Sequence, residues 1–385
     1  MFWSKKKTDK RDKTNKYEHL WKDVGAVFLL VILLSVITFV SAKTIFKDGY
    51  GTINFDSKDF AGKDVLNKDK EKPLLDFDDY DKRVWNLANI GPMSTTTAST
   101  TTAMTTTTPA KKKLWPAETV YPEYGAILPF SRIVAYYGNY LSTKMGILGE
   151  FEPEMMLEKL KTQVAEWEKA DPETPVVPAL EYIAVVAQAS PGADGKYKSR
   201  MPDAEIDKTI ELAKEINGIV ILDIQIGLSD LQTEVPLLEK YLKMPQVHLA
   251  IDPEFAMHNG KKPGTVIGSM DADDVNYVAN YLASLVKEND LPPKILIVHR
   301  FTQAMVMHTE DIKPLPEVQI VINMDGWGPK WMKYDSYDVV VYKEPVQFAG
   351  IKIFYKNDLK TPSTGILTPE EVLKMKPRPI YIQYQ

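Results

Sequence analysis

The stretch from Val318 to Gly328 reads VQIVINMDGWG, and it carries the pattern that decides the fold. Its first part is rich in β-branched apolar residues and predicts a buried strand, whereas DGWG is typical of a loop that follows a strand. Seven more runs of this kind occur in the last 254 residues of the 385-residue chain. Their mean spacing of about 35 residues is the size of one strand–helix unit. They begin near Arg132, Val176, Ile219, Val247, Lys294, Phe348 and Arg378.

The intervals between these runs contain amphipathic stretches. Residues 152–169, 202–217 and 272–288 place apolar side chains on one stripe with a helical period. The last of these stretches is entered through Asp271, which is a favourable N-cap residue. The sequence TPEE that starts at Thr368 reads as another helix start. We therefore predict helices between the strands.

Eight strands that alternate with helices predict an α/β fold, a (β/α)₈ TIM-like barrel over residues 115–385. The eighth run stands at the end of the sequence, so we expect the last outer helix to be missing, with Trp115 to Phe130 covering the gap. An open, doubly wound sheet is the alternative fold. No glycine-rich phosphate loop follows the first run, which speaks against a nucleotide ligand, and we expect no cofactor.

The N-terminal part of the chain has a different composition. Residues 1–23 form a basic tail, and residues 24–42 (VGAVFLLVILLSVITFVSA) contain no charge, which predicts a single transmembrane helix with its N-terminal side in the cytoplasm. A cleaved signal peptide is the alternative. Residues 43–114 are predicted to be a stalk and linker, because the fifteen residues from Ser94 to Thr108 include ten threonines. We expect the barrel domain to lie outside the cytoplasm, anchored to the cell membrane.

The overall composition excludes several classes of protein. A hydrophobic fraction of 44% supports a sizeable core and excludes global disorder. The net charge of −5 argues against nucleic acid as a partner. The absence of cysteine excludes disulfides, a thiol nucleophile and a cysteine-ligated zinc site.

Polar side chains gather where the predicted strands end, and the C-terminal end of the strands is where barrels carry their function. Alternation along a strand puts Gln319, Asn323 and Asp325 on one face, opposite an apolar face that must meet the helices. The same alternation turns the acids of other strands inward, so five carboxylates should converge at the C-terminal mouth of the barrel. Arg300 is the expected counter-charge. These carboxylates belong to Glu181, Asp223, Asp252, Glu254 and Asp325.

Other side chains are expected around the same mouth. His248 stands near the start of its strand and is predicted to be structural at the opposite end of the barrel. Aromatic rings offer flat faces on which sugars stack, while acids and amides bind sugar hydroxyls. The aromatic residues near strand ends are Tyr136, Tyr137, Phe255, Phe301, Trp327, Trp331 and Tyr355.

The sequence Asp252-Pro253-Glu254 at the end of the fourth run resembles the D-x-E strand end of barrel glycoside hydrolases of the chitinase and lysozyme type. The barrel layout also resembles that of uncharacterised bacterial secreted barrel proteins. The longer pattern D-x-x-D-x-D-x-E is incomplete, because Ala250 stands in place of its middle aspartate. The resemblance implies that Glu254 protonates the leaving sugar oxygen and that Asp252 orients a group or tunes its pKa.

Glycoside hydrolysis needs a second, ionised carboxylate, for which Asp325 and Asp223 are the candidates. The predicted function is a membrane-anchored, extracytoplasmic glycoside hydrolase-like protein that acts on cell-wall or other surface polysaccharide. The expected substrate-binding residues are Glu181, Gln225, His299, Arg300, Trp327, Tyr355, Tyr137 and Gln383.

Two other functions fit the same residues. The first is a non-catalytic barrel that binds a glycan or a protein partner. The second is a divalent-metal hydrolase of phosphoester or amide bonds, since carboxylates and amides suit Mg²⁺ or Ca²⁺. In the favoured hypothesis the site holds no metal.

Overall fold

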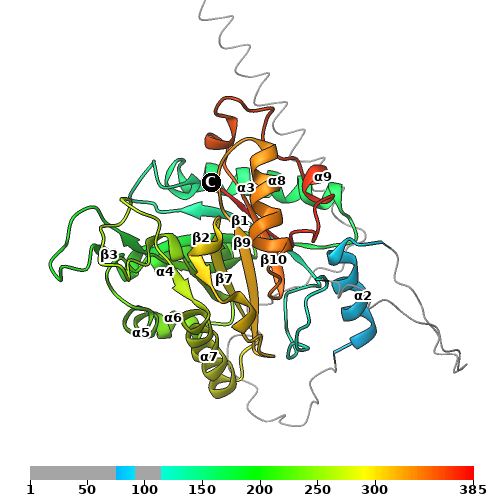
Figure 1. Cartoon of the computed structure of the whole chain (residues 1–385), viewed down its shortest axis with the longest axis horizontal. Coiled ribbons are helices and arrows are strands. Elements are labelled where there is room, and N and C mark those ends of the chain that lie inside the picture. The colour runs from blue at the N-terminus through cyan, green and yellow to red at the C-terminus, as the bar shows by residue number, and fades with distance from the viewer. Residues whose placement is uncertain (1–74, 92–113) are drawn as a thin grey trace, which may run out of the picture. The chain divides into compact units, whose positions relative to one another are not determined.

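A computed structural model of the chain describes residues 75–91 and 114–385 (Figure 1). The predicted transmembrane segment 24–42, the basic tail and most of the stalk lie outside these residues. Within the two described ranges, no helix has the length and apolar character needed to cross a membrane. The anchor therefore stays a prediction.

Eight parallel strands form a closed barrel, as predicted. Closure follows from β1, which pairs with β2 on one side and with β11 on the other, and this excludes the open sheet. The last strand begins three residues after Arg378, where the eighth run starts. The strands are β1 (Arg132–Gly138), β2 (Val176–Ala187), β4 (Ile219–Ile224), β5 (Val247–Ile251), β7 (Lys294–Arg300), β9 (Val318–Met324), β10 (Phe348–Ile353) and β11 (Tyr381–Tyr384).

Helices surround the barrel, and the predicted stretches at 152–169, 202–217 and 272–288 are helical. Asp271 and Thr368 each form a capping box. The α-helices are α2 (Phe77–Ala88), α3 (Pro153–Ala170), α4 (Asp203–Lys214), α5 (Leu231–Glu234), α6 (Glu239–Leu242), α7 (Ala272–Asn289), α8 (Lys330–Tyr337) and α9 (Pro369–Val372).

Short elements lie in the loops between the strands and helices. The short strands are β3 (Lys198–Arg200), which pairs with β2, and the pair β6 (Met270–Asp271) and β8 (Val306–Met307). The short helical turns are Ile147–Gly149, Pro236–Leu238, Pro253–Phe255, Gln303–Met305, Thr309–Asp311, Asp338–Tyr342 and Asn357–Leu359.

Strand alternation divides the core into two layers. Ile133, Ala135 and Val321 pack inside the barrel, while Ile320 and Met324 pack outward under the helices. This is the parity predicted from the sequence of β9. The inner layer is largely apolar near the start of the strands, and the acidic inward residues follow toward the C-terminal ends.

The gap beside β11 is covered differently from the prediction. Helix α3 lies there, and its Trp167 donates a hydrogen bond from Nε1 to Tyr384 Oη at 2.9 Å. Residues 115–130 instead contact the N-terminal end of the barrel, where Ile127 and Leu128 donate backbone hydrogen bonds to Gln319 Oε1. The side chain of Gln319 points inward at the start of β9 and so offers these amides a buried partner.

Helix α2 lies within the segment 43–114 that the sequence predicts to be stalk and linker. It begins after Asp76, whose side chain accepts a hydrogen bond from Asp79 N, and it ends at Asn89 in a left-handed conformation. Asn89 Nδ2 donates to Met375 O at 2.8 Å, and Arg378 N donates to Leu87 O at 2.6 Å. These long-range bonds attach α2 to the residues that precede β11.

Candidate functional site

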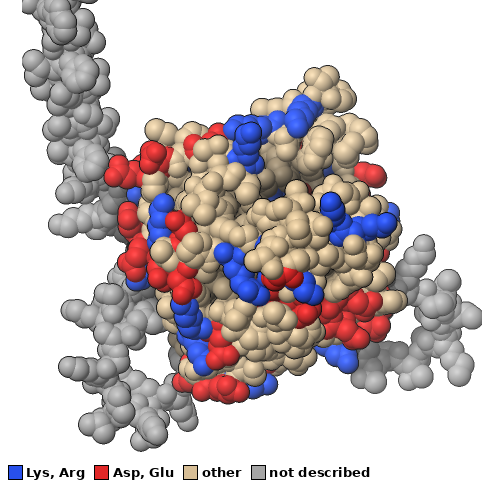
Figure 2. Space-filling model, turned by 90° about the vertical axis from the view of Figure 1, so that its left-hand side faces the viewer, with Lys and Arg blue, Asp and Glu red and all other residues tan. Residues whose placement is uncertain are grey.

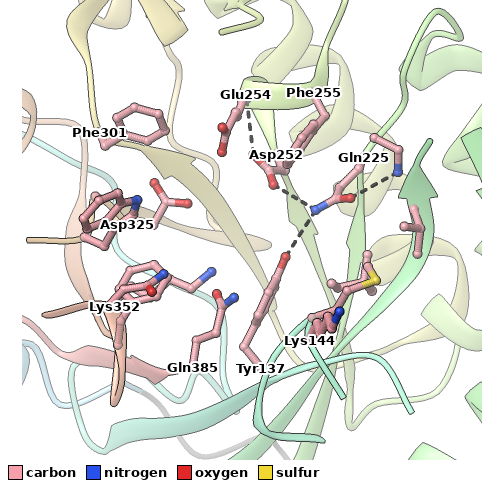
Figure 3. Close-up of a pocket in the computed structure, with 18 of the residues that line it drawn as sticks. Tyr137, Lys144, Gln225, Asp252, Glu254, Phe255, Phe301, Asp325, Lys352 and Gln385 are labelled. Atoms are coloured by element: carbon pink, nitrogen blue, oxygen red, sulfur yellow. Dashed lines mark hydrogen bonds between the residues drawn. The ribbon is translucent and has the colours of Figure 1, made fainter. Parts of the chain in front are cut away.

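A cavity of about 620 Å³ opens at the C-terminal ends of the barrel strands (Figure 3). Its polar wall includes Tyr137, Gln225, Asp252, Glu254, Asp325 and Lys352. Its apolar wall includes Phe255, Phe301, Trp327, Met332 and Phe354. The cavity therefore combines convergent carboxyl groups with aromatic rings, and we treat it as the candidate active site.

Glu254 and Asp325 point into the same space from different walls of the cavity (Figure 3). Asp252 caps the short turn Pro253–Phe255 by accepting a hydrogen bond from Glu254 N at 3.2 Å. Its other oxygen accepts a hydrogen bond from Gln225 Nε2 at 3.2 Å. The carboxyl group of Glu254 makes no hydrogen bond or ion pair with any described residue, so it is free to meet a ligand.

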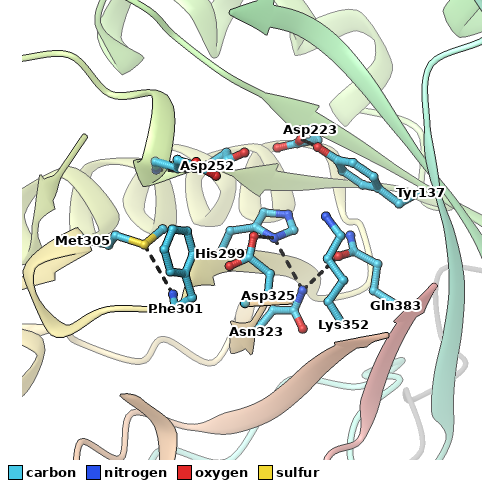
Figure 4. A network of polar contacts seen from close by, with 12 residues as sticks. Tyr137, Asp223, Asp252, His299, Phe301, Met305, Asn323, Asp325, Lys352 and Gln383 are labelled. Atoms are coloured by element: carbon cyan, nitrogen blue, oxygen red, sulfur yellow. Dashed lines mark hydrogen bonds and ion pairs between the residues drawn. The ribbon is translucent and has the colours of Figure 1, made fainter. Parts of the chain in front are cut away.

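A polar network lies beneath Asp325, deeper in the barrel (Figure 4). His299 Nε2 lies 3.0 Å from Glu181 Oε1, and His299 Nδ1 lies 3.2 Å from Asp325 Oδ2. Glu181 also accepts hydrogen bonds from Tyr381 Oη and Gln383 Nε2. Burial alone would lower the pKa of His299, but its bonds to the two carboxylates raise it well above 6.5. The two carboxylates thus favour the cationic form of His299, which ties Asp325 to the barrel interior.

Burial acts to raise the pKa of each carboxyl group in the cavity, but the neighbouring charges differ, and so the net shifts differ in direction. For Asp325, the hydrogen bond to His299 and the charges of His299 and Lys352 outweigh burial and hold the pKa below 3.8. For Glu254, burial and the charge of Asp325 raise the pKa above 4.5. Burial and neighbouring acids raise the pKa of Asp252 well above 3.8. Asp325 is thus the ionised member of the group, and Glu254 tends toward its protonated form.

Asp223 lies fully buried at the inner end of the site. Its Oδ2 accepts a hydrogen bond from Tyr137 Oη at 3.1 Å, and its Oδ1 has no hydrogen-bond partner. Burial raises the pKa of Asp223 to about 7, with the charge of His299 acting in the opposite direction and that of Glu181 adding to the rise. Its position beneath Tyr137 keeps Asp223 out of the cavity wall.

Lys352 is a cavity residue that the sequence analysis missed. It lies on β10 with its Nζ 3.6 Å from the centroid of the Tyr137 ring. Its positive charge helps to lower the pKa of Asp325 and opposes the larger effect of burial, which raises the pKa values of Glu254 and Asp223. Alternation along β10 turns Phe348 and Lys352 to the same inner face, and this pattern could have identified the residue.

Comparisons with known proteins give no family for this chain. No family model matches it, and no curated protein matches it. Among solved structures it is similar to the crystal structure of the Clostridial cellulose synthase subunit Z from Clostridioides difficile, with 10% identity and a TM-score of 0.33. That match covers 66% of this chain and 92% of the other. A likeness this low supports no functional argument, and the barrel assignment rests on the strand pairing itself.

Ten of the predicted site residues lie in or directly beneath the cavity, and they form two groups. The first group lines the cavity and contains Tyr137, Gln225, Asp252, Glu254, Asp325 and Trp327. The second group lies buried beneath the cavity and contains Glu181, Asp223, His299 and Gln383. The five predicted carboxylates therefore do converge at one end of the barrel.

Arg300 is not the counter-charge of these carboxylates. It lies on the outer face of β7, where its Nη2 donates to Val306 O at 2.7 Å and forms an ion pair with Glu344 at 2.6 Å. The physical reason is strand parity, since His299 points inward and the next residue must point outward. His299 and Lys352 supply the positive charge in its place.

Tyr355 and Tyr136 also lie away from the mouth, contrary to expectation. Tyr355 Oη donates a hydrogen bond to Gln163 Oε1 at 2.9 Å on helix α3, and its ring stacks on Tyr384. Tyr136 meets Tyr355 on the outer side of the barrel. His248 lies where it was predicted, and its Nδ1 accepts a hydrogen bond from Ile295 N at 3.1 Å near the start of β7.

One group of side chains in the described residues has the spacing of a metal site. Ligand atoms of Glu181, Asp223 and His299 all lie within 4.8 Å of one another. Both ring nitrogens of His299 already face carboxylate oxygens, and a protonated imidazole cannot bind a metal ion. The donor set therefore fits a cationic histidine better than a coordinated ion.

Charged side chains are mixed on the molecular face drawn in Figure 2, where lysine and arginine alternate with acidic residues instead of forming a continuous basic surface. The expectation that nucleic acid is not a partner stays a prediction.

Proposed function

We propose that this chain is a glycoside hydrolase in which Glu254 is the general acid and Asp325 is the general base or nucleophile. The observation that carries the proposal is that Glu254 and Asp325 line one cavity, with the Glu254 carboxyl group uncommitted to a described residue and Asp325 Oδ2 held 3.2 Å from His299 Nδ1. The pKa of Glu254 is raised and that of Asp325 is lowered in keeping with these surroundings. Hydrolysis of a glycosidic bond requires one protonated and one ionised carboxyl group across the scissile bond.

In this mechanism Glu254 transfers its proton to the glycosidic oxygen as the bond to the anomeric carbon breaks. Asp325 either removes a proton from the attacking water or attacks the anomeric carbon directly. The free carboxyl group of Glu254 supports its role, because it is not committed to a protein partner. Asp325 is favoured over Asp223 as the second carboxylate, since Asp223 does not line the cavity and its pKa is about 7.

Asp252 and His299 act on this pair as positioning residues. Asp252 fixes the turn that carries Glu254 through its bond to Glu254 N. His299 keeps Asp325 ionised and holds its carboxylate in place.

The proposed substrate is a polysaccharide, because aromatic rings line the cavity and two exposed tryptophans follow β9 in the chain. Trp327 lines the cavity and is 53% exposed, while Trp331 is 62% exposed on helix α8. Rings of this kind offer flat apolar faces to sugar rings. A cell-wall or surface polysaccharide would match the predicted membrane anchor and threonine-rich linker.

The test is release of reducing ends from a panel of defined polysaccharides by the wild-type protein and by Glu254→Gln. The proposal predicts that at least one substrate is cleaved and that the variant cleaves it at least about 100-fold more slowly. Cleavage at an undiminished rate by the variant would remove this mechanism. Binding of a glycan without cleavage, with affinity unchanged when Glu254 and Asp325 are neutralised, would instead identify a binding barrel.

A further inference from the structure

A buried ion pair outside the catalytic pair joins two walls of the cavity. Lys333 on helix α8 and Asp358 in the turn after β10 each have a side chain that is 1% exposed, and Lys333 Nζ lies 3.1 Å from Asp358 Oδ2. Neither residue is part of the proposed chemistry. Buried ion pairs seldom add net stability, so this pair is a candidate for a positioning role.

The hydrogen bonds of the pair reach backbone atoms on both walls. Lys333 Nζ donates to Gly326 O at 2.8 Å, next to Asp325, and to Lys352 O at 2.6 Å at the end of β10. Asp358 accepts hydrogen bonds from Gly328 N and from Phe354 N, each at 2.9 Å. The loop that carries Asp325 and Trp327 is thereby fastened to the strand that carries Lys352.

We propose that Lys333 and Asp358 are positioning residues that hold the loop 325–328 and the end of β10 at a fixed separation, so that Asp325 and Lys352 face the substrate together. The positioning itself rests on hydrogen bonds alone. Its consequence for catalysis rests on the proposed function. A displacement of about 1 Å in a reacting group can reduce an enzymatic rate by about 100-fold.

The charge of Lys333 gives the proposal a signature that ordinary loss of packing would not produce. Several groups face Asp325: His299 on β7, Lys352 on β10, Lys333 on α8, and the two acids that follow β5, Asp252 and Glu254. Removal of the Lys333 charge raises the pKa of Asp325. The acid limb of the rate profile, which follows ionisation of Asp325, should then move to higher pH.

The test uses the full-length chain with Lys333→Met, and with Lys333→Met/Asp358→Asn, which leaves no lone buried charge if the single variant folds poorly. The matched control is Arg132→Met, which breaks another buried ion pair, with Asp171, at the N-terminal end of β1. Hydrogen exchange followed by mass spectrometry measures the peptides 325–332 and 352–358 in the unliganded proteins. Hydrolysis of aryl oligoglycosides gives kcat, KM and the pH profile.

We expect faster exchange in both peptides for the Lys333 variants and unchanged exchange there for Arg132→Met. We also expect kcat to fall about tenfold or more with KM within about threefold, together with the shifted acid limb. Localised faster exchange in a protein that cleaves no glycoside would support the positioning and remove the proposed function. Unchanged exchange in both peptides of a folded Lys333 variant, or an acid limb that stays in place in active Lys333→Met, would overturn the inference.

Discussion

Glu254→Gln is expected to reduce the rate of hydrolysis without reducing the stability of the fold. The side chain keeps its size but loses the acidic proton, so protonation of the leaving oxygen disappears. General acid catalysis contributes about 10²- to 10⁴-fold, which corresponds to about 2.7 to 5.4 kcal/mol in the activation free energy. The loss should be large for natural glycosides and much smaller for aryl glycosides, whose leaving groups need little protonation.

The folded state should tolerate this change. The Glu254 carboxyl group makes no hydrogen bond or ion pair with a described residue, and its charged form is repelled by Asp325. We therefore expect the melting temperature to stay the same or to rise. The control is Glu173→Gln, an exposed residue before β2 at the other end of the barrel. If Glu254→Gln kept more than about a tenth of the wild-type rate on natural glycosides, the assignment of the acid would be refuted, since even a weak acid catalyst contributes more.

Four other substitutions test the site and the residues around it. Asp325→Asn removes a partner of buried His299, so urea unfolding at pH 7 should show a loss of about 3 kcal/mol or more, with hydrolysis abolished; a neutral effect on stability would contradict the ion pair. Asp223 has a folded pKa near 7, above its unfolded value, so its charge costs stability as pH rises from about 4 to 7. Thermal melts should therefore show that Asp223→Asn gains stability over wild type at pH 8 but not at pH 4. Trp331→Ala should raise KM for long oligosaccharides by roughly fivefold, for a stacking contribution of about 1 kcal/mol, and leave KM for disaccharides unchanged; equal effects on both would remove the stacking surface. Arg300→Met should reduce stability by about 3 kcal/mol through loss of its bond to Glu344, while kcat of the folded protein stays within about twofold, and a selective loss of kcat would return Arg300 to the site.

The fold was predictable because its signal is local and repeated. Each of the eight strand runs can be recognised by its β-branched residues, and the segments between them show the apolar periodicity of helices. Alternation then places Asp223, Asn323 and Asp325 inside the barrel without further information. The convergence of the five carboxylates follows from these two rules, since parallel strands carry their C-terminal ends to one rim.

The wrong and missing assignments have two physical sources, which are strand parity at Arg300 and contacts between residues far apart in the chain. Arg300 was assigned to the mouth although parity turns it outward, because a free positive charge beside the acids was needed. Lys352 supplies that charge, but a lysine within a strand is usually expected at the surface. Buried Lys333 is hidden for the same reason. Helix α2 is held by bonds from Asn89 and Arg378 that span more than 280 residues, and no local pattern predicts such partners.

The central claim is that two carboxyl groups share one cavity in opposite states of protonation. Carboxyl ¹³C NMR titration tests it directly, with Glu254 and Asp325 assigned by difference from Glu254→Gln and Asp325→Asn. We predict a midpoint above 4.5 for Glu254 and below 3.8 for Asp325, with the Glu254 midpoint falling when Asp325 is replaced. The account would be contradicted by midpoints in the reverse order. It would also be contradicted by two unshifted midpoints, with that of Glu254 unchanged when Asp325 is replaced.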